Sequence, residues 1–377
     1  MSRARDFADL AGSADAGGLT GRNLIINGAM TVDQRNATTT ATGYTLDRFR
    51  IVKSTSFDEL VIAVTQDADN PSGNGFANSL KLAVTTAESA IASDELMYLQ
   101  HGLEGQDIHH VAYGTSSAKS LTLSFWVKSP LAGKHAVTFY QQTPARSNLQ
   151  SYTVSSANTW EHKTITIDGD TSGNIVNDNS HEFTIFWPLA GGSDYHGTPH
   201  TGWGAYSATD DFMFSDQVNL AGQTGNFYLT GIQLEVGEQA TPFEHRSFHD
   251  ELRRCKRYFE RFAKTLTSVG QASEANCGLW SGMSRSGNSG NNQGVMTYQT
   301  KRTNPSISVS SAAHINGVFP ISPFAASLSS FGIDGNAGID NCFVNAANNA
   351  STAPSSDCGS SGVMGDSSGT LDIDAEL

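Results

Sequence analysis

The sequence predicts a mainly β protein: an antiparallel jelly-roll sandwich over residues 21–245, a short connecting amphipathic helix over 246–264 and a smaller β-rich domain over 265–377. Short stretches of alternating apolar and polar residues recur along the chain, each bounded by Gly, Pro, Asn, Asp or Ser. No helical pattern separates them, which favours an antiparallel sandwich. The 377 residues allow two or three hydrophobic cores, since a domain usually takes ~100–200 residues.

The clearest predicted strand is SLTLSFWVK at 120–128. Its alternation places one set of apolar residues on a single face, namely Leu121, Leu123, Phe125 and Val127. Such a strand is half-buried. The same period of two predicts further strands at 79–84, 135–140, 162–167, 181–187 and 226–236.

The predicted helix begins with a capping signal, Ser247 followed three residues later by Asp250. Apolar residues then follow at spacings of four, three, four and three: Phe248, Leu252, Cys255, Phe259 and Phe262. This stripe covers two heptads, fewer than the ~3–4 that indicate a free-standing coiled coil. It therefore fits either a helix packed on its own sandwich or a bundle between chains, with Phe248, Leu252, Phe259 and Phe262 as candidate oligomer-interface residues.

The two ends of the chain have different compositions. Residues 1–20 are small and polar, and we expect a short helix or arm that orders only against a partner. After residue 264 the chain is rich in Ser, Gly, Asn and Ala, yet strand-like stretches remain at 294–300, 306–311, 341–346 and 370–377. We expect a small β domain with long loops and a thin core, which association with other copies would help to bury.

The composition argues against several classes of partner. The formal net charge is −14 and the pI is near 5.1, so nucleic acid would be repelled. No apolar run approaches the ~18–20 residues of a membrane span, and the N-terminus lacks the apolar stretch of a signal peptide. We therefore expect no membrane insertion, and synthesis in a cytoplasm. The four cysteines are widely spaced and are predicted to be free thiols, with a Cys342–Cys358 bridge as the alternative.

Motifs for catalysis or metal binding are weak or lacking. DGDTSGN at 168–174 places Asp168 and Asp170 as in a calcium loop, but position 12 is Asn179 instead of Glu, so a tight turn is favoured. Asp210 and Asp211 fit an acidic loop. The histidines lack zinc-ligand spacing: His109, His110, His181, His196 and His200. Nucleophile-elbow and phosphate-loop motifs do not occur, so we expect no enzyme activity, metal or cofactor.

The stretch FWPLAGGSDYHGTPHTGWGAYSATDD at 186–211 is the strongest candidate for ligand binding. It places four aromatic residues among Gly, Asp, His and Thr, a mixture suited to stacking on sugar rings: Trp187, Tyr195, Trp203 and Tyr206. Two alternatives remain. Trp187 and Trp203 could cap the core, or the loop could pack against a neighbouring subunit.

Two long stretches of the sequence carry a family resemblance. RNLIINGAMTVDQRNATTTATGYTLDRF at 22–49 and LTGIQLEVGEQATPFEHRSFHDELRRCKRYFER at 229–261 resemble signatures that flank a jelly-roll module in bacteriophage virion proteins, such as tail fibres and related appendages. The first signature is carried by Asn23, Leu24, Asn27, Gly28, Met30, Gln34, Arg35, Tyr44, Asp47, Arg48 and Phe49, and the second by Gln233 through Phe259.

The resemblance implies a non-enzymatic structural subunit of a phage particle, a homotrimer whose jelly roll is similar to carbohydrate-binding modules. Residues 1–20 would attach it to tail or capsid proteins of the virion, and the distal domain or the 186–211 loops would meet a glycan on the host surface. A capsid fibre, capsid decoration or tail adaptor with a purely assembly role is the alternative, and a polysaccharide depolymerase is less favoured. The short arm and the lack of a collagen-like or heptad-rich stem favour a compact protein seated directly on the virion.

Overall fold

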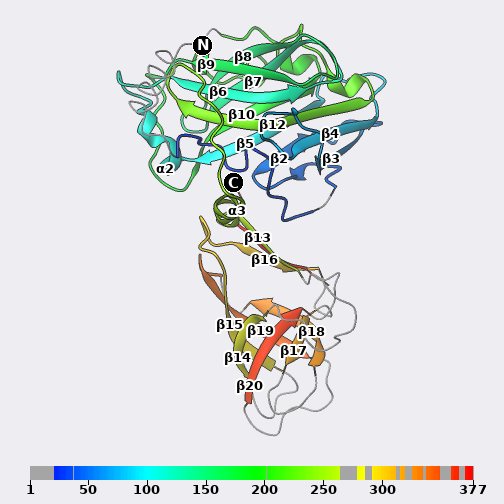
Figure 1. Ribbon diagram of the computed structural model, residues 1–377, viewed down its shortest axis with the longest axis vertical. Coiled ribbons are helices and arrows are strands. Elements are labelled where there is room, and N and C mark those ends of the chain that lie inside the picture. The colour runs from blue at the N-terminus through cyan, green and yellow to red at the C-terminus, as the bar shows by residue number, and fades with distance from the viewer. Residues whose placement is uncertain are drawn as a thin grey trace. The chain divides into compact units, whose positions relative to one another are not determined.

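The structure is a computed structural model that describes residues 21–36, 38–200, 202–263, 278–284, 291–310, 315–318, 325–333, 337–348, 358–364 and 370–376. The chain divides into two compact units, with the boundary between Leu252 and Arg253 (Figure 1). The predicted arm over residues 1–20 lies outside the described residues.

The first unit is a sandwich of two antiparallel sheets, which confirms the predicted fold class. The larger sheet is built from β1 (Gly43–Tyr44), β2 (Phe49–Lys53), β5 (Leu96–Glu104), β7 (Gly133–Gln141), β8 (Arg146–Val154), β10 (His181–Gly191) and β11 (Gly204–Ala205). Its strand order is β1-β2-β5-β10-β7-β8-β11, so β8 and the short β11 form one edge.

The smaller sheet is built from β3 (Val61–Asp67), β4 (Ser79–Thr86), β6 (Leu121–Lys128), β9 (Glu161–Ile167) and β12 (Gly225–Val236), in the order β3-β4-β12-β6-β9. Short turns of helix lie in the connections: α2 (Gly105–Ile108), η1 (His109–Val111), η2 (Ser193–Tyr195) and η3 (Leu220–Gly222). No helix in the part of the chain that the structure describes is long and apolar enough to cross a membrane.

The six predicted strands of this unit are confirmed as β4, β6, β7, β9, β10 and β12. Alternation gave no prediction for β2, β3, β5 or β8, nor for the two-residue strands β1 and β11. In β8 the reason is visible, because two core-facing positions are the polar Asn148 and Gln150. In β5 the core-facing row of Met97, Leu99 and Leu103 is interrupted by the polar His101, which is also buried.

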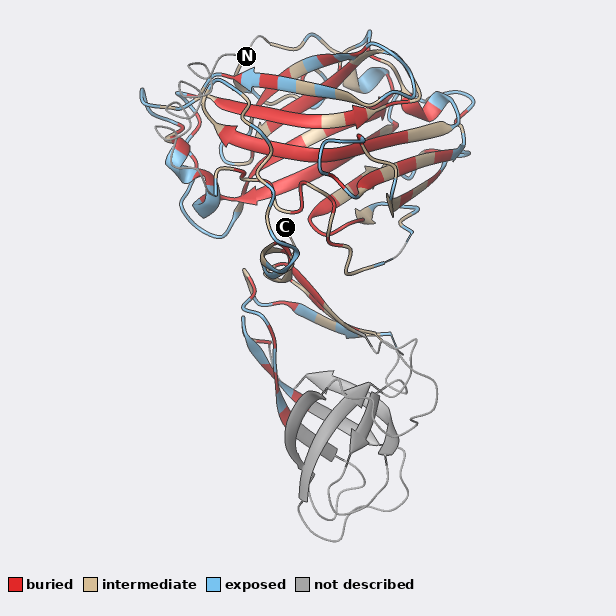
Figure 2. Ribbon diagram, viewed as in Figure 1, coloured by how far each residue is buried: buried red, intermediate tan, exposed pale blue. Residues whose placement is uncertain are grey.

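The two sheets enclose one hydrophobic core (Figure 2). All four alternating apolar residues of β6 are completely buried, as predicted. From the larger sheet, Trp187 of β10 packs its ring edge-on against Phe125, with ring centroids 6.1 Å apart. Burial of each such side chain stabilises the fold by about 1.5–3 kcal/mol, so this core fixes which face of each strand points inward.

The two stretches that carry the family resemblance lie against each other. Arg246, whose side chain is almost completely buried, donates hydrogen bonds to the carbonyls of Asn23 and Ile25, the second at 2.9 Å. Glu244 accepts a hydrogen bond from the backbone N of Asn23 at 2.8 Å. Charged groups make stronger hydrogen bonds than neutral ones, so these contacts join the start of the sandwich to the segment that leaves it.

A second set of contacts closes the turn at residues 27–32. Asn27 Nδ2 donates to the carbonyls of Val32 at 2.8 Å and Asp47 at 3.0 Å. Glu251, in the segment after the sandwich, accepts a hydrogen bond from the backbone N of Asn27. Several signature residues therefore have a direct role in holding the two ends of the sandwich together.

Helix α3 spans Phe248–Lys256, and Ser247 Oγ accepts the backbone N–H of Asp250 at 3.2 Å, as the capping signal predicts. The predicted extent to residue 264 is wrong. The chain forms β13 (Phe259–Ala263), which pairs with β21 (Thr370–Asp374) near the far end of the sequence. Local spacing cannot reveal so distant a partner, and the pairing overrides the helical pattern.

The four candidate interface residues are thereby separated. Phe248 is 59% exposed and Leu252 is partly buried, both on α3. Phe259 lies in β13 and is almost completely buried, and Phe262 packs against the core of the second unit. The prediction that Phe259 and Phe262 belong to one apolar face of a helix is therefore wrong, because strand pairing packs both residues within their own unit.

The second unit contains two further sheets. One has the order β13-β21-β16, with β16 at Ser306–Val309. The other closes on itself in the order β14-β15-β19-β18-β17-β20 and is built from β14 (Gly278–Ser284), β15 (Asn291–Thr297), β17 (Ile315–Val318), β18 (Ala325–Ile333), β19 (Asn341–Asn348) and β20 (Cys358–Met364). The strand-like stretches predicted after residue 264 correspond to β15, β16, β19 and β21.

The described core of this unit is small: Met296, Tyr298, Ala337, Cys342, Val344, Leu371 and Ile373. Beside it, Lys301 and Glu260 form a buried ion pair at 3.0 Å. Cys255 and Cys342 are buried free thiols, which confirms the prediction for these two residues. Burial raises the pKa of the Cys342 thiol to about 11.

Candidate functional site

Aromatic side chains gather on the outer face of the seven-stranded sheet. On β10, Ile185 and Trp187 point into the core, so Phe186 between them points outward and is only partly buried. Pairing places Thr184 opposite Tyr140 of β7, and Pro188 opposite Tyr98 of β5. Since these positions differ from Phe186 by two residues, both tyrosines share its outward face.

The rings are in contact with one another. Phe186 lies between Tyr98, with ring centroids 5.2 Å apart, and Tyr140, with centroids 5.6 Å apart. Tyr206 meets the ring of Tyr140 at 4.7 Å. Phe212 meets Tyr98 at 5.3 Å and Tyr195 at 5.4 Å. We call this surface the aromatic face: Tyr98, Tyr140, Phe186, Tyr195, Tyr206 and Phe212.

Hydrogen bonds hold the segment from residue 192 to 217 against part of this face. Thr138 Oγ1 donates to the carbonyl of Phe212 at 3.1 Å, and Gln217 Nε2 donates to the carbonyl of Pro188 at 3.1 Å. Phe212 is buried as a result, whereas Tyr195 and Tyr206 remain partly exposed. The loop therefore adds two accessible rings to those of the sheet.

The phenols of the aromatic face are neutral hydrogen-bonding groups. Burial raises the pKa of Tyr98, Tyr140, Tyr195 and Tyr206, to about 12 for Tyr206, where the neighbouring tyrosines and Asp211 act in the same direction. The hydroxyls of Tyr98, Tyr140 and Tyr206 make no hydrogen bond within the described ranges. Each is thus available to donate to a ligand and to accept from it.

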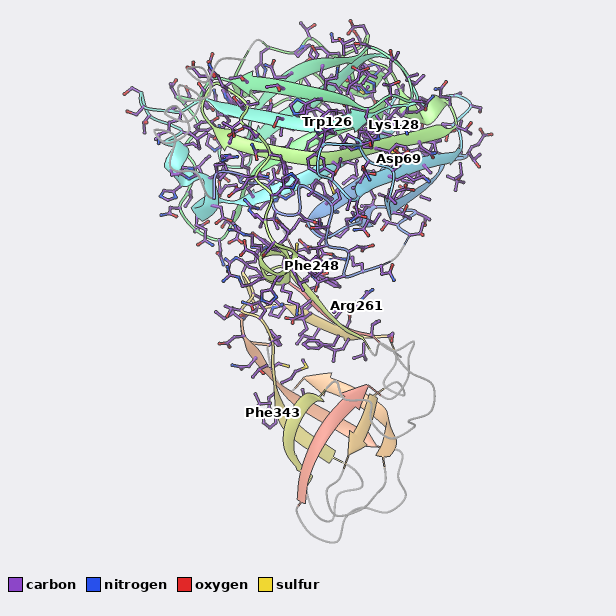
Figure 3. The ribbon with its side chains drawn as sticks, in the orientation of Figure 1. Asp69, Trp126, Lys128, Phe248, Arg261 and Phe343 are labelled. Carbon is purple, nitrogen blue, oxygen red and sulfur yellow. The ribbon has the colours of Figure 1, made fainter. Side chains whose placement is uncertain are left out.

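The outer face of the other sheet is different, because its polar groups pair with one another. Lys128 of β6 contacts Asp69 at 2.5 Å (Figure 3). Trp160 Nε1 donates a hydrogen bond to the same carboxylate at 2.9 Å. Lys81 pairs with Asp67 at 3.1 Å. A ligand there would have to displace existing ion pairs, so the aromatic face is the better candidate.

The predicted ligand residues are distributed over three places. Tyr195 and Tyr206 lie on the aromatic face. Trp187 is 0% exposed and belongs to the core, so its prediction as a ligand residue is wrong. The reason is the alternation of β10, in which the outward aromatic residue is Phe186. Trp203 lines a separate cavity.

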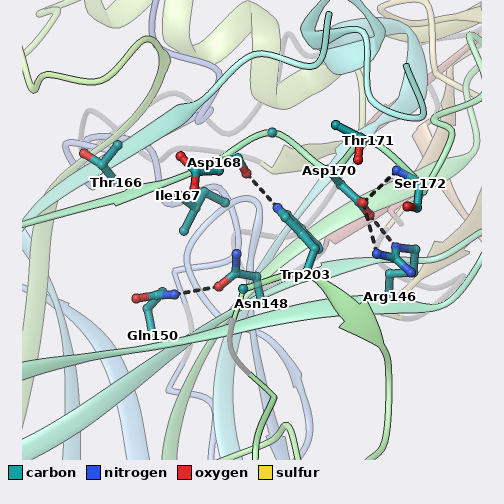
Figure 4. A pocket seen from close by; sticks show the side chains of 12 residues that line it. Arg146, Asn148, Gln150, Thr166, Ile167, Asp168, Asp170, Thr171, Ser172 and Trp203 are labelled. Atoms are coloured by element: carbon teal, nitrogen blue, oxygen red, sulfur yellow. Dashed lines mark hydrogen bonds and ion pairs between the residues drawn. The ribbon is translucent and has the colours of Figure 1, made fainter. Parts of the chain in front are cut away.

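This cavity, the edge pocket, opens between β8 and β9 at the edge of the sandwich and has a volume of about 390 Å³ (Figure 4). It is lined by Arg146, Asn148, Gln150, Thr166, Ile167, Asp168, Gly169, Asp170, Thr171, Ser172, Gly202 and Trp203. Figure 4 shows Trp203 between the Asn148–Gln150 pair and the Arg146–Asp170 pair.

The DGDTSGN stretch forms the turn that lines this pocket. The carboxylate of Asp170 accepts hydrogen bonds from Arg146 at 2.5 Å, Gln141 at 2.8 Å and the backbone N of Ser172 at 3.0 Å. Burial alone would raise the pKa of Asp170, but these hydrogen bonds and the Arg146 charge hold it below its usual value. The carboxylate is therefore already engaged by protein groups.

Histidines and carboxylates elsewhere make structural contacts. His200 Nδ1 lies 2.8 Å from Asp211 Oδ1, and its Nε2 lies 2.9 Å from the carbonyl of Ser147. Asp210 accepts the hydroxyl of Ser207 at 2.8 Å. Within the described ranges, no three His, Cys, Asp or Glu residues are placed to hold a metal ion.

Comparison with known proteins gives structural likeness only. No protein-family model and no curated protein matches the chain. The enzymatically active domain of tailspike protein 4 from bacteriophage CBA120 is similar at a TM-score of 0.32 and 10% identity, over 57% of this chain and 21% of that one. The match thus spans about a fifth of the tailspike structure.

Two further solved structures are similar at the same level. A family 11 carbohydrate-binding module of a Clostridium thermocellum cellulosomal cellulase has a TM-score of 0.28 and 12% identity, over 54% of this chain and 97% of that one. A putative sugar binding protein from Bacteroides thetaiotaomicron has a TM-score of 0.30 and 13% identity, over 57% and 100%. Such low scores carry no information on what this chain binds.

Proposed function

We propose that this chain is a glycan-binding protein and that the aromatic face is its binding surface. The observation that carries the proposal is the continuous group of aromatic rings on one sheet face, with free phenol hydroxyls among them. The C–H faces of sugar rings stack on aromatic rings, and phenols hydrogen-bond sugar hydroxyls at the rim.

We further propose that the protein serves as a non-enzymatic subunit of a phage particle, contributing to attachment at the host surface. The sequence resemblance to virion appendages supports this role. A homotrimer attached to other virion proteins through residues 1–20 belongs to the same proposal. Light scattering of the purified chain tests it, and a monomer at micromolar concentration would count against that assembly.

The binding test is a screen of the full chain against immobilised glycans, followed by titration calorimetry with the best ligand. Phe186→Ala should weaken binding about tenfold, because an aromatic contact contributes about 0.5–1.5 kcal/mol beyond its buried area and 1.4 kcal/mol is tenfold. Tyr206→Ala should act in the same direction. The matched control is Trp126→Ala, which removes a partly exposed ring from the outer face of the other sheet (Figure 3).

Three outcomes are informative. Selective loss in Phe186→Ala and Tyr206→Ala supports the aromatic face. An equal loss in Trp126→Ala would move the site to the other sheet. If the wild-type chain binds none of a broad glycan set, the function proposed here is wrong and a purely assembly role gains support.

A further inference from the structure

We propose that the edge pocket is a second ligand site, separate from the aromatic face, for a neutral hydroxyl-rich ligand such as the terminal sugar of a glycan. The pocket lies where the two sheets part, between β8 and β9. Its volume of about 390 Å³ falls in the range of small-molecule sites, roughly 300–1,000 Å³.

The first argument is a polar pair at core-facing positions. Asn148 is opposite Phe139 and Gln150 is opposite Val137, so both amides occupy positions that are apolar on the neighbouring strand. Asn148 is 2% exposed, and its Oδ1 accepts from Gln150 Nε2 at 2.7 Å. Within the described residues, Asn148 Nδ2 and Gln150 Oε1 have no hydrogen-bond partner.

Neither atom is among the completely buried unpaired polar atoms of the described residues, so both are open to the pocket, where water or a ligand can supply their hydrogen bonds. A sugar hydroxyl both donates and accepts. One hydroxyl can therefore accept a hydrogen bond from Asn148 Nδ2 while another donates a hydrogen bond to Gln150 Oε1.

The second argument is the fixed indole of Trp203. Its Nε1 donates to the carbonyl of Asp168 at 2.8 Å. Its ring packs against Tyr113 and Phe183, with centroids 5.7 and 6.2 Å apart. The indole is thus held by the core and also lines the pocket, as a stacking surface for a sugar ring requires.

The third argument is charge. Arg146, the positive group among the lining residues, is paired with Asp170, and Asp168 adds a further carboxylate. An anionic ligand would meet no unpaired positive charge, so acidic sugars and phosphates are disfavoured. Neutral sugars fit both the charge and the hydrogen-bonding groups.

One edge strand connects the two sites. Strand β11 pairs with β8, with Gly204 opposite Ser147 and Ala205 opposite Arg146. Trp203 precedes this strand and lines the edge pocket, and Tyr206 follows it and contacts Tyr140 on the aromatic face. The same short segment therefore supplies one aromatic ring to each site.

The test uses the full chain and four neutral monosaccharides as probes: glucose, galactose, mannose and N-acetylglucosamine. Saturation-transfer NMR should detect at least one, with a Kd of about millimolar because so few atoms make contact. Glucose 6-sulfate serves as the anionic probe and should give at least a tenfold weaker signal. Trp203→Ala and Gln150→Leu should each weaken the neutral sugar at least tenfold, and Trp203→Phe should keep most of the binding.

Trp126→Ala, which removes a partly exposed ring from the outer face of the other sheet and lies in neither proposed site, is the matched control and should leave monosaccharide binding unchanged. Thermal unfolding of each variant shows whether the fold is intact, and the half-exposed Gln150 provides a second variant if Trp203→Ala unfolds. The proposal is overturned if none of the four sugars gives a saturable signal, if glucose 6-sulfate binds best, or if Phe186→Ala abolishes monosaccharide binding while Gln150→Leu does not. Loss of long-glycan binding in Phe186→Ala alone would support the aromatic face independently of this pocket.

Discussion

Acid should destabilise the sandwich through His135, which lies on the core-facing side of β7. The residue is 1% exposed, its ring stacks on Tyr152 at 5.3 Å, and its Nε2 lies 3.2 Å from the carbonyl of Leu131. Burial lowers the pKa of His135 from 6.5 to about 4, against the opposing effect of the Leu131 carbonyl. The folded protein therefore prefers the neutral imidazole.

The sign of the effect follows from the two pKa values. Because the folded-state pKa is the lower one, the unfolded chain takes up a proton first as the pH falls below 6.5. The free energy of unfolding then decreases until the pH passes the folded-state value near 4. At about 1.4 kcal/mol per pKa unit, the loss is about 2 kcal/mol by pH 5 and about 3 kcal/mol by pH 4.

The assay is urea unfolding between pH 8 and pH 4, followed by tryptophan fluorescence. Four of the five tryptophans, Trp126, Trp160, Trp187 and Trp203, lie in the sandwich and report its transition. His135→Phe should be less stable than the wild type at pH 8 by about 1 kcal/mol, because it lacks the hydrogen bond, and should become the more stable of the two below about pH 6, where the wild type has lost about 1 kcal/mol.

The control is Val137→Ala, a substitution in the same strand that removes no titrating group. The loss of stability caused by Val137→Ala should be the same at every pH, because the substitution changes no titrating group. Other buried histidines, such as His101, remain in all three proteins and contribute equally to the pH dependence of each. If His135→Phe shows the same pH dependence as the wild type, the reasoning about His135 is wrong.

Three further predictions concern the fold. Gly28→Ala should lower the free energy of unfolding by more than about 2 kcal/mol, because a Cβ there would lie 2.1 Å from the carbonyl O of Ile232. Thermal unfolding should show a far smaller loss for Gly222→Ala, whose Cβ would have its nearest neighbour at 4.0 Å. Arg246→Met should lower the free energy of unfolding by about 2–4 kcal/mol, because the carbonyls of Asn23 and Ile25 lose their charged hydrogen-bond donor. An unchanged unfolding midpoint would contradict this. Cys342 should resist iodoacetamide at pH 8 until urea is added, because burial raises its pKa to about 11, and rapid labelling of the native chain, mapped by mass spectrometry, would refute its burial.

Strand prediction succeeded where apolar residues occupy the core-facing positions of a strand and mostly polar or amphipathic residues occupy the positions between them. In β6, four buried apolar residues alternate with polar or amphipathic ones, so the sequence itself reveals the strand. In β8 the inward positions of Asn148 and Gln150 are polar, and the pattern disappears at the place where the structure forms a pocket. The departure from alternation was itself the available signal for that site.

The site prediction depended on which side of a strand faces inward. The 186–211 stretch does supply Tyr195 and Tyr206 to the aromatic face. The sequence did not distinguish Phe186 from Trp187, because adjacent residues point to opposite faces and only the packing of the two sheets decides which face is buried. Tyr98 and Tyr140 come from strands far apart along the chain, and hydrogen-bonded pairing with β10 brings them together.

The sequence by itself determined the fold class, six of the twelve strands of the sandwich and the cap of α3, because alternation and capping depend on neighbouring residues. The tertiary structure alone decided that the helix ends at Lys256, that Trp187 is core and that Trp203 lines a pocket between the sheets. These features depend on strand pairing and on packing between residues that are distant in the chain. The local periodicity of the sequence gives no information about such contacts.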